Sequence, residues 1–146
     1  MKIWFDMDGT IADLYGVDGW LECLINKDER PYKEAKPLVN MNSLARMLNN
    51  LQRKGVEIGV ISWLAKNSTE EFDERVKETK EKWLAKHLKS VKFNTIEIVK
   101  YGTDKDKVRT TKEEILFDDE ENNRRNWKGI KAYNQENIIT ILKGLK

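Results

Sequence analysis

Short apolar segments alternate with longer amphipathic ones along this chain. Residues 2–5 form an apolar run that stops at Asp6, the pattern of a buried parallel strand ending in a polar turn. Apolar side chains then recur at helical spacing through residues 42–54, and Gly55 follows as a stop signal. Residues 56–61 are rich in branched apolar side chains, which favours a second strand.

The second half of the chain continues this alternation. Residues 68–71 have the spacing of a capping box headed by Ser68, and the helix that they begin keeps one apolar face as far as Leu88. The remaining expected elements are strand segments at 91–93, 95–99, 115–117 and 129–133 and a last helix from Asn134.

Strands that alternate with helices predict a three-layer α/β/α, Rossmann-like domain with a central parallel sheet of about five strands. Residues 14–40 do not fit the alternation, because they hold two prolines and only a short apolar patch. They follow the first strand directly, and we expect them to form a small helical insertion. The length of 146 residues suits one domain spanning residues 1–146.

Composition narrows the possible classes of protein. The 27 basic and 25 acidic side chains give a net charge of only +2, which does not favour a dedicated nucleic-acid binder, so no stable nucleic-acid partner is expected. Cys23 is the single cysteine, which excludes an intramolecular disulfide and favours a reducing compartment. No apolar run approaches the roughly 20 residues that a membrane span needs, and we expect a cytoplasmic location.

Polar residues of reactive type follow three of the predicted strands: Asp6 and Asp8, then Ser62, then Asp118 and Asp119. In a doubly wound sheet the carboxyl ends of the strands border the ligand-binding crevice. Crowded carboxylates repel one another unless a cation is present, and their oxygens suit Mg²⁺, which also binds phosphate oxygens. One aspartate alone would be an ordinary turn residue, but the complete set indicates a site for metal-assisted phosphoryl transfer.

The same residues carry a resemblance to a known family. Residues 5–13 (Phe-Asp-Met-Asp-Gly-Thr-Ile-Ala-Asp) resemble the first motif of the haloacid dehalogenase (HAD) superfamily, residues 61–62 its second and residues 115–119 its fourth. More loosely, residues 82–88 and 102–105 are similar to the small nucleotidase branch that includes the 5′(3′)-deoxyribonucleotidases.

The resemblance implies a role for each residue of the set. Asp6 would attack phosphorus and become an aspartyl-phosphate, while Asp8 would act first as general acid and then as general base. Ser62 would donate a hydrogen bond to a phosphoryl oxygen. Asp118 would complete a Mg²⁺ site with the Asp6 carboxylate and the Asp8 backbone carbonyl, and Asp119 would hold a metal-bound water or orient its neighbours.

The family also implies a lysine that neutralises charge on the phosphoryl group. Lys105 fits the family spacing together with Val108, Lys107 lies closer to Asp118 in the sequence, and Lys100 is a further candidate. The sequence leaves the choice among the three lysines open.

In this superfamily an insertion after the first motif forms a cap over the active site. Here it is short enough to make only a small flap, which contains Tyr15 and Trp20, and Trp63 directly follows Ser62. If these rings face the crevice, they offer stacking surfaces for a nucleobase, although aromatic side chains more often fill cores.

The leading hypothesis is a Mg²⁺-dependent phosphomonoester hydrolase that acts on a small phosphorylated substrate, with a nucleoside monophosphate favoured. The alternatives are a phosphatase that processes nucleic-acid ends and a non-catalytic binding protein on the same scaffold. The sequence indicates no oligomeric state.

Overall fold

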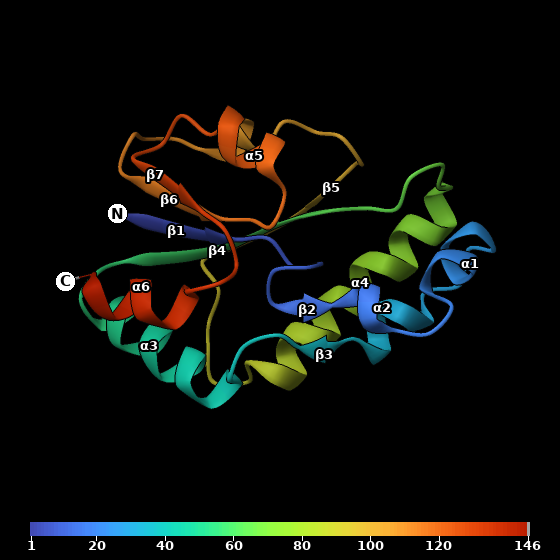
Figure 1. Cartoon of the computed structure of the whole chain (residues 1–146), viewed down its shortest axis with the longest axis horizontal. Coiled ribbons are helices and arrows are strands. Elements are labelled where there is room, and N and C mark those ends of the chain that lie inside the picture. The colour runs from blue at the N-terminus through green and yellow to red at the C-terminus, as the bar shows by residue number, and fades with distance from the viewer. Residues whose placement is uncertain (146) are drawn as a thin grey trace.

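A computed structural model describes residues 1–145 and contains a parallel five-stranded sheet in the order β5-β4-β1-β6-β7 (Figure 1). The strands of this sheet are β1 (Lys2–Phe5), β4 (Glu57–Trp63), β5 (Thr95–Val99), β6 (Glu114–Phe117) and β7 (Lys131–Tyr133). The helices are α1 (Trp20–Ile25), α2 (Arg30–Glu34), α3 (Met41–Arg53), α4 (Glu70–His87), α5 (Glu121–Asn126) and α6 (Ile138–Gly144), with 3₁₀ turns η1 (Leu14–Gly16) and η2 (Lys105–Val108). The sheet confirms the predicted α/β class and the expected number of strands.

The central strand β1 is buried on both faces of the sheet. Ile3 and Phe5 join the larger core cluster, to which α3, α4 and α6 contribute side chains. Trp4 points to the opposite face and packs with Leu116 and Trp127. Since successive side chains of a strand point to opposite faces, the helices flank the sheet on both sides, with α5 lying across from α3 and α6 (Figure 1).

The predicted insertion follows β2 (Ala12–Asp13) and includes β3 (Lys36–Pro37), which pairs with β2 in antiparallel direction. It contains α1 and α2, which sit beside α4 (Figure 1). The Arg75 side chain on α4 donates to the Lys27 carbonyl at 2.9 Å and to the Glu29 carboxylate at 3.2 Å. We call residues 14–40 the flap, and these contacts hold it against α4.

Three local predictions were wrong. Residues 91–93 form no strand, because Val91 donates its N–H to the Leu88 carbonyl at 3.1 Å and both side chains pack into the core, which makes the segment a turn between α4 and β5. The cap of α4 is Thr69, one residue beyond Ser68. The last helix begins at Ile138, because the Asn134 side chain accepts from the Glu136 N–H and forms a turn instead. None of the helices within residues 1–145 is long and apolar enough to cross a membrane.

Candidate active site

The two aspartates of the first motif lie at the carboxyl end of β1. The Asp6 N–H donates to the Phe117 carbonyl of β6 at 2.9 Å, and the chain then turns sharply, with three successive N–H groups donating to the Met7 carbonyl. Gly9 adopts φ +82°, and a Cβ at this position would lie only 2.4 Å from an Asp119 carboxylate oxygen. Both the turn and the close approach of Asp119 therefore require glycine at this position.

Lys105 is the lysine that the structure brings to these carboxylates. Its Nζ, in a side chain only 2% exposed, donates to Asp6 Oδ1 at 2.8 Å and to Asp118 Oδ2 at 2.7 Å. Burial alone would lower the pKa of Lys105, but the Asp6 and Asp118 carboxylates raise it above its ordinary value, so the amine stays protonated. Lys100 and Lys107 are exposed on the surface.

A buried network behind η2 positions the loop that carries Lys105. Glu114, at the start of β6, is 1% exposed. Its Oε1 accepts from Trp4 Nε1 at 2.8 Å, and its Oε2 accepts from the backbone N–H groups of Thr110 at 2.9 Å and Thr111 at 2.6 Å. The loop between Lys105 and Asp118 is thereby fixed to the core of the sheet.

Asp118 and Asp119 follow β6 and lie beside Asp6. The Asp118 carboxylate accepts from the Glu120 N–H at 2.9 Å and from Asn123 Nδ2 at 3.1 Å, while Thr10 Oγ1 lies within 3.1 Å of Asp6 Oδ2 and Asp119 Oδ1. Burial and then the Asp6 charge raise the pKa of Asp118 to about 6. Burial, a hydrogen bond with Asp6 and the charges of Asp6 and Asp118 raise the pKa of Asp119 to about 8.

Three of the carboxylates have the arrangement of a metal site. Asp6, Asp118 and Asp119 each offer one oxygen, and these oxygens all lie within 4.8 Å of one another. Burial is the main cause of the raised pKa values of Asp118 and Asp119, and the charge of Asp6 adds to it. Hard oxygen donors with excess negative charge suit Mg²⁺. The cluster therefore fits the predicted cation, with Asp119 in a position to join Asp6 and Asp118.

The Asp8 carboxylate points instead to a lysine that the sequence analysis missed. Lys80 on α4 is 1% exposed, and its Nζ donates to Asp8 Oδ2 at 2.8 Å, to Ser62 Oγ at 2.7 Å and to the Trp63 carbonyl at 2.7 Å. A signal for it does exist, because Lys80 continues the four-residue spacing of Phe72 and Val76 along the buried face of α4.

Ser62 and Asp8 thus share one cation. Ser62 is fully buried at the end of β4 and does not line the cavity in front of the aspartates. Burial raises the pKa of Asp8, an effect that the Lys80 charge opposes and the Asp6 charge reinforces. A carboxyl group with a raised pKa holds a proton more readily at neutral pH, as a general acid must.

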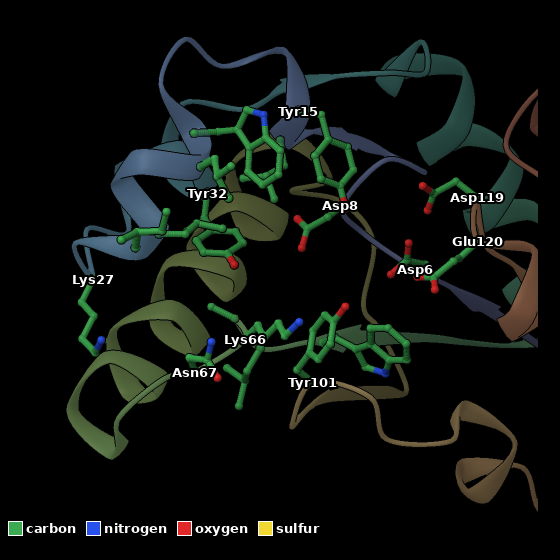
Figure 2. Close-up of a pocket in the computed structure, with 18 of the residues that line it drawn as sticks. Asp6, Asp8, Tyr15, Lys27, Tyr32, Lys66, Asn67, Tyr101, Asp119 and Glu120 are labelled. Atoms are coloured by element: carbon green, nitrogen blue, oxygen red, sulfur yellow. The ribbon is translucent and has the colours of Figure 1, made fainter.

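A cavity of about 470 Å³ opens in front of Asp6 and Asp8 (Figure 2). Tyr15 and Tyr32 of the flap form one wall, Tyr101 lies on the facing wall, and Lys66 and Asn67 lie toward the end away from Asp6. The apolar or aromatic lining residues are Leu14, Tyr15, Trp20, Leu21, Leu24, Ile25, Tyr32, Trp63, Leu64, Ala65 and Tyr101.

The three aromatic residues singled out from the sequence all line this cavity. The rings of Tyr15 and Trp20 pack edge to face, with their centroids 4.9 Å apart. Burial and the charges of Asp8, Asp119 and Asp6 raise the pKa of Tyr15. Trp63 Nε1 donates to the Thr103 carbonyl at 2.9 Å. Trp4, Trp83 and Trp127 are buried packing residues, as the sequence indicated.

Comparison with known proteins gives a match in structure alone. No protein-family model matches the chain, and no curated protein sequence matches it significantly. Among solved structures, the D,D-heptose 1,7-bisphosphate phosphatase from Burkholderia thailandensis aligns with a TM-score of 0.59 and 10% sequence identity, covering 98% of this chain and 96% of that one. The sheet order and this match show that the chain shares the α/β fold of that phosphatase, and the acidic cluster of Asp6, Asp118 and Asp119 lies where β1 and β6 end.

Proposed function

We propose that this chain is a Mg²⁺-dependent phosphomonoester hydrolase that works through an aspartyl-phosphate on Asp6. The observation that carries the proposal is the convergence of Asp6, Asp8, Lys105 and Asp118 at one edge of the sheet, directly in front of a substrate-sized cavity. The fold shared with a bisphosphate phosphatase supports this reading.

In the first half of the reaction, an oxygen of the Asp6 carboxylate attacks phosphorus. The new O–P bond forms as the bond to the leaving oxygen breaks, and Asp8 gives that oxygen its proton. The raised pKa of Asp8 favours the protonated form that this step needs. In the second half, Asp8 takes a proton from water as the water attacks phosphorus, and cleavage of the O–P bond restores the Asp6 carboxylate and releases phosphate.

The site also has to balance the charge of the phosphoryl group. Lys105 lines the cavity and donates to two carboxylates, so the third N–H of its ammonium remains for a phosphoryl oxygen. Asp6, Asp118 and Asp119 would hold a Mg²⁺ ion, which would supply Lewis-acid stabilisation of the negative charge on the phosphoryl group. Together these cations let a buried carboxylate approach a negatively charged substrate.

The cavity beside this site favours a nucleoside monophosphate as substrate. Tyr15, Tyr32 and Tyr101 present aromatic surfaces on facing walls within reach of the aspartates. A nucleobase is planar and stacks on such rings whatever its identity, whereas a sugar alone would leave most of this apolar lining uncovered.

Release of phosphate from a generic aryl phosphate, with and without Mg²⁺, tests the reaction. We expect Mg²⁺-dependent turnover that Asp6→Asn lowers by a factor on the order of 10³ or more, and that the matched surface variant Asp18→Asn leaves unchanged. Absence of activity in the parent protein would favour a non-catalytic binding protein, and equal activity in Asp6→Asn would exclude Asp6 as the nucleophile.

A substrate panel tests the second part of the proposal. Nucleoside monophosphates should have higher kcat/KM than sugar phosphates and than oligonucleotides phosphorylated at either end. Turnover of the oligonucleotides alone would replace the mononucleotide by a nucleic-acid terminus as substrate.

A further inference from the structure

We propose that Lys80 is a positioning residue, which Ser62 and the Trp63 carbonyl hold in place so that it fixes the proton-transferring carboxylate of Asp8. This inference rests on the proposed phosphatase function, because it explains what orients the Asp8 carboxylate for proton transfer in that reaction.

The hydrogen bonds of Lys80 account for its whole donor capacity. An ammonium group has three N–H donors, and the three acceptors of Lys80 lie at 2.8 Å on Asp8, 2.7 Å on Ser62 and 2.7 Å on Trp63. No N–H is left for a substrate oxygen, and Lys80 does not line the cavity. Lys80 therefore differs from Lys105, which lines the cavity and keeps one donor available.

Ser62 acts on Lys80 rather than on the cavity. Its hydroxyl is buried at the end of β4, and its oxygen accepts from Lys80 Nζ. With the neighbouring carbonyl of Trp63, it supplies two fixed acceptors on one strand. These two bonds place the ammonium group in one position and leave its third N–H directed at Asp8.

The bond to Lys80 determines which oxygen of Asp8 faces the substrate. Lys80 occupies Oδ2, and the Asp8 side chain remains 17% exposed where it borders the cavity. Oδ1 is thus the oxygen available to protonate the leaving group. The Tyr32 ring of the flap lies 4.8 Å from Lys80 Nζ and covers the ion pair.

The experiment compares Lys80→Met with Lys77→Met, a control at an exposed position on the same helix. The measured quantity is kcat/KM for two phosphate esters, one with a nitrophenolate leaving group and one with an alkoxide. An alkoxide needs a proton from Asp8 in order to leave, whereas a nitrophenolate does not. Because kcat/KM covers only the steps up to the aspartyl-phosphate, hydrolysis of the intermediate does not enter the comparison.

We expect Lys80→Met to lower kcat/KM by about 10²-fold for the alkyl ester, the size of a general-acid contribution, and by less than about tenfold for the nitrophenyl ester. When Asp8 is already replaced by Asn, the Lys80→Met change should lower kcat/KM little further. The effects of substitutions at residues that act as a unit are not additive. Equal losses for the two esters would overturn the proposal, since a general structural defect does not discriminate between leaving groups.

Ser62→Ala provides a second, smaller perturbation in case Lys80→Met folds poorly. It should show the same selective loss for the alkyl ester, and the Ser62→Ala, Lys80→Met double variant should be no worse than Lys80→Met alone. If the fall in kcat/KM of the double variant equals the product of the falls of the two single variants, Ser62 binds the phosphoryl group independently of Lys80. That result would overturn the proposal that Ser62 acts through Lys80 on Asp8. An inactive parent protein would instead exclude the phosphatase function itself.

Discussion

Removing the Tyr101 ring should weaken binding of a nucleotide without slowing the chemistry. Tyr101 follows β5, is 54% exposed and lies with its ring centroid 5.1 Å from that of Trp63. Lys66 Nζ lies 5.9 Å from the same ring. The opposite wall belongs to the flap, so Tyr101→Ala removes one face of the space that a base would occupy and leaves the aspartates untouched.

The magnitude follows from the area that the ring offers. Stacking of one base on an aromatic side chain contributes about 1–3 kcal/mol. Because Tyr101 is half exposed and backed by Trp63 on one side only, the lower end of this range applies, about 1–1.5 kcal/mol, which corresponds to a rise in KM of about 5- to 12-fold. Loss of binding that is equal in the ground state and the transition state raises KM and leaves kcat unchanged.

Steady-state kinetics with a nucleoside monophosphate and with glycerol phosphate, which lacks a ring, measure this effect. Tyr101→Ala should raise KM for the nucleotide only, and Tyr101→Phe should stay within about twofold of the parent because it retains the stacking surface. An equal rise in KM for both substrates would refute the stacking reasoning, because glycerol phosphate has no ring to lose contact with Tyr101.

Three further predictions concern the parts around the site. Glu114→Gln should cost about 2–4 kcal/mol in urea unfolding, because the amide nitrogen cannot accept a hydrogen bond and would face either the Trp4 donor or the Thr110 and Thr111 donors. Burial alone would raise the pKa of Glu114, but hydrogen bonds lower it below its ordinary value. The parent should therefore gain stability from Glu114 above about pH 4.3 and lose it as pH falls further, and Glu114→Gln should reduce this loss. Mg²⁺ should raise the melting temperature of the parent and of Asp18→Asn but not that of Asp118→Asn, because the proposed ion site needs the Asp118 carboxylate and forms only in the folded protein. Arg75→Ala should change stability by less than about 1 kcal/mol, yet speed hydrogen exchange in α1 and α2, since Arg75 holds the Lys27 carbonyl of the flap.

Much of the fold follows from local patterns in the sequence. Residues 2–5 and 56–61 are continuous apolar runs, and such runs are stable as strands only when both faces of a sheet are covered. The segment at 91–93 has the same alternation as a short strand, but the Val91 N–H donates to the Leu88 carbonyl three residues earlier and the Val91 side chain enters the core. The packing of Val91 against core residues far away in the sequence has no local signature.

Some residues of the candidate site can be identified from local sequence patterns, and others cannot. Asp6, Asp8 and Asp118 are identifiable because each immediately follows a strand whose carboxyl end borders the crevice. Lys80 is 18 residues from Ser62, the nearest predicted site residue, and stands in a helix with several other lysines, so only its place on the apolar face sets it apart. The choice of Lys105 over Lys107 depends on which side chain η2 turns inward, which spacing alone does not determine.

The arrangement of charges explains how two aspartates only two residues apart can take different roles. Asp6 shares Lys105 with Asp118 and belongs to the cluster of three carboxylates whose oxygens could hold a metal ion. The Asp8 carboxylate has its own cation in Lys80. A single lysine shared by all the carboxylates would tie proton transfer to metal binding, because each event would change the charge that the other depends on. With one lysine on each side, the proposed proton carrier Asp8 and the proposed nucleophile Asp6 each have a cation of their own.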